Sequence, residues 1–180
     1  GIVGIIAAIL PALSIPSLYL RAKKLLVQSC DWLLQQELVG ADKKSFFPSS
    51  MNDNHYSRLG WCYGDLTIAL TLARVGKVLE FPSYIEKAKE ISLHAAQRED
   101  YSAMVQDAGI CHGSAGIALI FQLLHKELQL EELIPVVNNW LNVTLELYSD
   151  KGLKGYYKYS GFEKDHVACG INPVEKERKH

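Results

Sequence analysis

The sequence has no marked excess of either charge and few cysteines. Its 180 residues carry a formal net charge of −1, which indicates no surface for nucleic acid or anionic lipid, so we expect no nucleic-acid partner. The four cysteines (Cys30, Cys62, Cys111 and Cys169) are too widely spaced for a disulfide framework, and they favour a reducing, cytoplasmic setting in which thiolates bind metal. The chain also lacks a P-loop, a dinucleotide-binding glycine fingerprint and any low-complexity segment, so the usual signs of nucleotide binding are missing.

The first twenty residues contain no charged side chain, and their length would allow them to cross a bilayer. Pro11 and Pro16 would break such a helix, and no basic residues precede it. We therefore favour an inner helix buried on all sides, followed by a turn at the prolines. Because the sequence starts without a methionine, we expect it to begin inside a longer protein.

Three apolar segments, 1–10, 64–73 and 113–122, share one pattern. Each begins with glycine, has a small residue three places later, and continues with isoleucine and an apolar run. Each is followed by a loop and an amphipathic stretch, at 20–38, 83–98 and 131–148. A pattern repeated at this spacing is typical of one supersecondary unit used several times. The sequence thus predicts an all-α fold of about three helical hairpins, each with an apolar inner helix and an amphipathic outer helix. The long connection at 39–59 is of a length that often forms a functional lip over a site.

Two of these repeats carry metal-binding residue types just before their glycine. Cys62 lies two residues before Gly64, Cys111 lies two residues before Gly113, and His112 lies between Cys111 and its glycine. In neighbouring repeats, these three side chains would sit at the same height at the ends of adjacent helices. Two thiolates and one imidazole form a three-ligand Zn²⁺ site with an open fourth position, the pattern of catalytic zinc.

Structural roles compete with this interpretation. Cys30, on an amphipathic stretch, is expected to be a packing residue, and Cys62 or Cys111 taken singly would also be a buried small hydrophobe. The pair in register beside His112 favours metal. Asp65 is interpreted as a favourable charge in the first helical turn. The histidines that do not recur at the repeat position are interpreted as solvated or packing residues: His55, His94 and His125.

The segment Trp61-Cys62-Tyr63-Gly64, followed by Cys111-His112-Gly113 and combined with the glycine-led inner helices, resembles the lanthionine synthetase C-like (LanC) cyclases. The resemblance covers most of residues 1–150. It implies a double-layered (α/α) toroid of seven helical hairpins with zinc at one end of its central cavity. It also implies a zinc-dependent cyclase that adds a peptide cysteine thiol to dehydroalanine or dehydrobutyrine in lantibiotic biosynthesis.

Carried over by position, the resemblance makes Cys62, Cys111 and His112 the zinc ligands. It matches Tyr63 to the tyrosine after the first zinc cysteine, and Arg58 to an active-site arginine. The family's general acid, a histidine before the glycine of an earlier inner helix, would be the residue immediately before Gly1. The family's second candidate, an aspartate, would lie further upstream, so we expect residues 1–180 to keep the metal site and to lack both candidate proton donors.

Three hairpins cannot close a toroid of seven, and the apolar surfaces of their inner helices would be exposed and prone to association. We expect residues 1–165 to form part of a LanC-like toroid with the zinc site, the C-terminal portion of a longer cyclase, and 166–180 to form an irregular charged tail. The partners implied are a dehydrated precursor peptide and a complex with a lantibiotic dehydratase and a membrane transporter. The alternatives left open are a non-catalytic zinc-binding helical repeat that binds peptide or glutathione, and an enzyme that adds glutathione to another electrophile.

Overall fold

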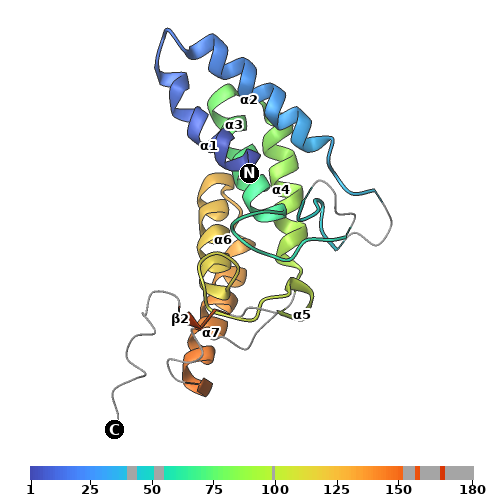
Figure 1. The fold of residues 1–180 in the computed structure, drawn as a ribbon, viewed down its shortest axis with the longest axis vertical. Coiled ribbons are helices and arrows are strands. Elements are labelled where there is room, and N and C mark those ends of the chain that lie inside the picture. Colours follow the sequence, from blue (N-terminus) through green and yellow to red (C-terminus); the bar gives the residue numbers. More distant parts are fainter. Residues whose placement is uncertain (40–43, 51–54, 99, 152–156, 159–166, 169–180) are drawn as a thin grey trace.

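The computed structural model describes residues 1–39, 44–50, 55–98, 100–151, 157–158 and 167–168. In these ranges most of the chain is helical, as the repeats predicted (Figure 1). The helices are α1 (Ile2–Ile9), the 3₁₀ helix η1 (Leu10–Ser14), α2 (Tyr19–Leu34), α3 (Asp65–Leu79), α4 (Pro82–Ala96), α5 (Asp100–Ala103), α6 (Ser114–Leu128) and α7 (Leu133–Lys151). Two short strands, β1 (Tyr157–Lys158) and β2 (Val167–Ala168), pair antiparallel with Tyr157 opposite Ala168.

Three helical hairpins follow one another along the molecule: α1–η1–α2, α3–α4 and α6–α7 (Figure 1). The inner helices contact in order, α1 with α3 and α3 with α6, and each packs against its own outer helix. The predicted hairpin architecture is therefore confirmed. The described part of the chain is an open row of hairpins.

Helix α3 forms the centre of the core because it is apolar on nearly every side. Eleven of its fifteen residues are buried, and it lies between α1, α4 and α6. Its C-terminal turn closes at Glu80 in the left-handed region, and the N–H of Phe81 donates to the carbonyl of Gly76 at 2.8 Å. Pro82 then starts α4 at a position where a missing N–H costs nothing. The tight turn and Pro82 together reverse the chain, so that α4 packs against α3.

Helix α1 differs from the expectation of burial on all sides. Within it Ile6 is buried, whereas Ile5 is 59% exposed and Ala7 and Ala8 are exposed. The reason is its position at one end of the row, where α2, η1 and α3 cover one side of the helix. The expected break at the prolines is present, since Pro11 lies in η1 and a turn containing Pro16 leads into α2.

No helix within the described ranges is long and apolar enough to cross a membrane. The irregular tail predicted at 166–180 lies outside the described residues, apart from β2.

Candidate metal centre

The loop before α3 brings Cys62 to the start of that helix. Gly64 adopts a φ of +80°, a conformation that favours glycine, and a Cβ there would lie 2.5 Å from the hydroxyl oxygen of Ser57. The loop is fastened to the next repeat, because the N–H of Trp61 donates to the carbonyl of Cys111 at 2.8 Å. Main-chain atoms therefore set the relative position of the two cysteine-bearing loops.

The loop before α6 carries Cys111 and His112 in a turn, as expected for adjacent residues that must face one point. Asp107 organises this loop: its side-chain oxygen accepts the N–H of Gly109 at 2.7 Å and its carbonyl accepts the N–H of Ser114 at 2.9 Å. The turn folds tightly over the first turn of α6, where a Cβ on Gly116 would overlap the carbonyl of Ile110. A glycine at position 116 is thus a steric requirement of the ligand loop.

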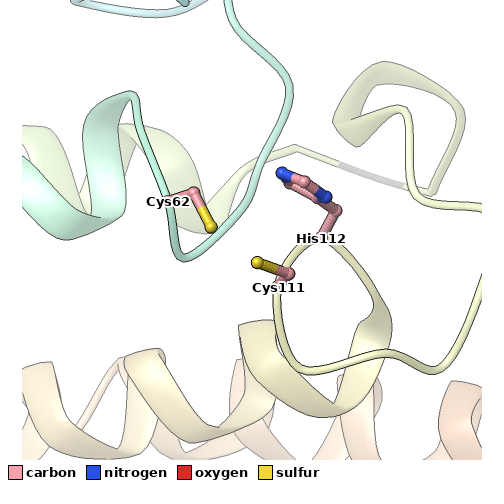
Figure 2. A group of neighbouring side chains, drawn as sticks. All are labelled: Cys62, Cys111 and His112. Carbon is pink, nitrogen blue, oxygen red and sulfur yellow. The ribbon is translucent and has the colours of Figure 1, made fainter. Parts of the chain in front are cut away.

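The three predicted ligands converge (Figure 2). The sulfurs of Cys62 and Cys111 and a ring nitrogen of His112 all lie within 4.8 Å of one another. Two sulfurs bound at about 2.3 Å to one tetrahedral zinc lie about 3.8 Å apart, so side-chain adjustments would bring these atoms into bonding range. Two soft sulfur donors and an imidazole fit Zn²⁺ by chemistry as well as by spacing.

The electrostatics of the cluster follow from the proximity of the two thiols. Partial desolvation raises the pKa of Cys62, and the hydrogen bond and charge of Cys111 raise it further. The guanidinium of Arg58 lowers the pKa of the same thiol. A bound cation would act in the direction of Arg58, because it favours the thiolate form.

The two candidate catalytic residues lie beside the cluster. The ring of Tyr63 is half-buried and packs against that of His112, with centroids 5.4 Å apart at a tilt of 44°. Arg58 is half-buried and close enough to act on the Cys62 thiol through its charge. Their catalytic roles stay predictions.

The residues expected to be structural behave in that way. Cys30 is fully buried, and burial raises the pKa of its thiol to about 12. The ring of His94 meets that of Phe46 edge-on at 5.0 Å, and His125 contacts the carbonyl of Leu130 through Nδ1 at 2.9 Å.

Asp65 has a larger structural role than the first-turn charge expected of it. It is 2% exposed, and its two carboxylate oxygens accept the N–H groups of Phe46 and Phe47 at 3.0 and 2.9 Å. Burial raises the pKa of this carboxyl, while the two N–H donors and the nearby charge of Arg98 lower it. The available signal was an acidic residue at the start of an apolar inner helix, where a buried charge needs partners.

Arg98 also supports the loop before α3 that carries Cys62, a role that sequence reasoning missed. It is buried, and its Nη2 donates to the carbonyls of Ser57 and Ser102, both at 2.8 Å. It thereby holds the segment that leads to Cys62 against the end of α4. A basic residue at the end of an amphipathic stretch gives no sequence sign of this role.

A cavity of about 610 Å³ opens beside Cys62, between α1, α2 and α3. The long connection contributes to its wall through residues 47–50, so the described part of the predicted lip does border the site. Trp61, expected to be core or cavity wall, is half-buried and lines it. The candidate metal cluster therefore stands at the edge of a space large enough for a ligand.

Comparison with known proteins agrees with this arrangement. The family described as lanthionine synthetase C-like protein matches residues 1–168 of the chain. Among curated proteins, none matches the chain at a significant level.

Proposed function

Because the chain belongs to the lanthionine synthetase C-like family, we propose that it acts as a zinc-dependent cyclase that forms lanthionine thioethers. The observation that carries the proposal is the convergence of Cys62, Cys111 and His112 within 4.8 Å, on the loops that start two consecutive hairpins. The proposed substrate is a dehydrated precursor peptide of lantibiotic biosynthesis, which holds a cysteine and a dehydroalanine or dehydrobutyrine.

The ligand set determines the chemistry proposed. Two thiolates and a neutral imidazole balance the charge of Zn²⁺ and leave one tetrahedral position for a substrate sulfur. Zinc bound there would keep a peptide thiol deprotonated near neutral pH. The substrate sulfur forms a bond to Cβ of the dehydroamino acid, the π electrons move toward the carbonyl, and Cα takes up a proton. Net addition of S–H across the double bond involves no oxidant or reductant.

Arg58 and Tyr63 are the proposed catalytic residues of this chain. A guanidinium beside the reacting sulfur would stabilise the negative charge that develops on the substrate carbonyl oxygen. The ring of Tyr63 packs against His112 and would hold the imidazole in a ligating orientation. The proton that Cα receives must come from a further acid.

The proposed cellular location is the cytoplasm, and the proposed partners follow from the cyclase function. The cysteines of the described ranges, Cys30, Cys62 and Cys111, are free thiols, which suits the reducing cytoplasm. A lantibiotic dehydratase would supply the dehydrated peptide, and a membrane transporter would export the product.

The first test is metal content. The purified chain should bind about one Zn²⁺ per molecule, and Cys62→Ala or Cys111→Ala should reduce the bound zinc at least tenfold, since each removes one of three ligands. Cys30→Ala is the matched control, because it removes a thiol outside the cluster and should leave the zinc content unchanged. Mass-spectrometric metal analysis is combined with circular dichroism to check that the helices persist. Equal zinc in the wild type and both ligand variants would contradict the proposed site.

The second test is cyclisation itself. Ring formation leaves the mass of a dehydrated peptide unchanged, so the readout is loss of reaction with a thiol-alkylating reagent, compared with the spontaneous reaction without protein. Zinc-loaded protein should accelerate this loss, and Cys111→Ala should not. Retained zinc and peptide binding without acceleration would instead identify the non-catalytic zinc-binding repeat.

A further inference from the structure

The cavity beside Cys62 has walls unlike those of the metal cluster. Aliphatic residues of α1 and α3 form two sides, and aromatic side chains from three different elements form much of the remainder: Trp32, Phe47, Trp61 and Tyr63. Its volume of about 610 Å³ is large enough to admit a large side chain and lies within the range of ligand pockets. Polar side chains also line it, those of Gln36, Ser49, Ser50, Thr67 and Thr71, but most of the wall is apolar and favours apolar surface.

The charge of the walls is also informative. Among the described residues that line the cavity, Arg74 has the one charged side chain, and its Nε lies 3.1 Å from a carboxylate oxygen of Glu127. Lys77 contacts the other oxygen of the same carboxylate at 3.3 Å. An anionic ligand such as glutathione, which has two carboxylates, would have to compete with Glu127 for this cation.

Cys62 belongs to both features, since it lines the cavity and contributes a sulfur to the cluster. We infer that the cavity binds a large apolar or aromatic side chain adjacent to the reacting cysteine of the substrate peptide. Consecutive Cα atoms are about 3.8 Å apart, so a thiol at the cluster leaves its neighbouring side chain at the cavity mouth. The inference rests on the proposed function, and it assigns the substrate as a hydrophobic cysteine peptide in preference to glutathione.

The test compares short capped peptides, Ala-Phe-Cys-Ala, Ala-Ala-Cys-Ala and Ala-Glu-Cys-Ala, with glutathione. Calorimetric titration of the full, zinc-loaded chain should show the phenylalanine peptide binding at least about tenfold more tightly than the other three ligands. Equal affinities for the three peptides, or tighter binding of glutathione, would overturn the inference.

A matched pair of variants locates the effect. Ala7 is exposed and lines the cavity, whereas its neighbour Ala8 is exposed and does not line it. Ala7→Trp should place an indole ring in the part of the cavity next to α1 and remove the preference for phenylalanine without a change in zinc content. Ala8→Trp should keep the preference. A preference that survives Ala7→Trp would place the apolar contact elsewhere and refute the assignment.

One further ligand separates this inference from the proposed function. Ala-Phe-Ser-Ala has no thiol, so its binding to metal-free protein, relative to Ala-Ala-Ser-Ala, depends on the cavity alone. A preference for the phenylalanine peptide in that assay, lost in Ala7→Trp, would support the cavity even if zinc binding or cyclisation failed. No preference there would refute the cavity while the zinc and cyclisation tests stand independently.

Discussion

Replacing Asp65 by alanine tests how the segment at 44–50 is held against α3. The carboxylate accepts two main-chain N–H groups, those of Phe46 and Phe47, and both of these residues are buried. Alanine would leave both donors without their acceptor in the protein interior. Each buried polar group left unsatisfied costs about 1–3 kcal/mol, so the free energy of unfolding should fall by about 2–6 kcal/mol.

Two opposing effects narrow that range. Alanine relieves the cost of burying a carboxylate, a cost visible in the pKa that burial raises. It also removes the negative charge near the buried guanidinium of Arg98, which has the opposite effect on stability. We expect a net loss of about 3–4 kcal/mol, and for a chain of this size each kcal/mol lowers the melting temperature by about 2–4 °C. Asp65→Asn keeps one acceptor oxygen and should lose about half as much.

Thermal unfolding followed by circular dichroism measures the effect, with urea unfolding as an independent value of the free energy. Glu90→Gln is the control, because Glu90 is an exposed partner of Lys87 and its loss should change stability by less than about 1 kcal/mol. An Asp65→Ala protein that melts within about 2 °C of the wild type would refute the claim that this carboxylate anchors the segment.

The remaining predictions concern the ligand loop and a surface ion pair. Gly116→Ala should lower zinc affinity at least tenfold in a metal titration, because the added methyl displaces the loop that carries the ligands. Gly4→Ala, in open space on a helix, should leave zinc affinity unchanged and raise stability by up to about 1 kcal/mol. Arg74 and Lys77 lower the pKa of Glu127, so their stabilising effect is present above the unfolded-state value of about 4.3 and is lost as the pH falls through the folded-state pKa. Glu127→Gln should therefore be less stable than the wild type at pH 7 and equally stable near pH 2, and a deficit independent of pH would contradict this.

The sequence predicted the helical hairpins because glycine marks the start of every inner helix. In the structure α1, α3 and α6 each begin one residue after the glycine of their repeat, at Ile2, Asp65 and Ser114. The same register placed Cys62 and Cys111 side by side, because equivalent positions of adjacent repeats lie at the same level. Both predictions depended on the repeated pattern of the three glycine-led segments.

Features without a period were not predictable in this way. The bonds from Phe46 and Phe47 to Asp65 join residues 18 and 19 positions apart across an irregular connection, and no spacing rule marks them. The exposure of α1 was not predicted, because an apolar sequence shows only that a helix is able to be buried. Which of its side chains are buried depends on the helices that pack against it. The cavity likewise results from packing between three helices and a loop.

The hydrogen bond from the N–H of Trp61 to the carbonyl of Cys111 makes the position of the two loops independent of the side chains that would bind metal. This hydrogen bond joins two main-chain groups, so it forms whatever side chains the two loops carry. The metal-binding side chains can therefore be replaced without moving the loops. Serines at 62 and 111 would leave the two loops aligned and abolish the soft ligands. Substitutions confined to positions 62, 111 and 112 would therefore decide whether the two loops present a metal-binding set of donor atoms.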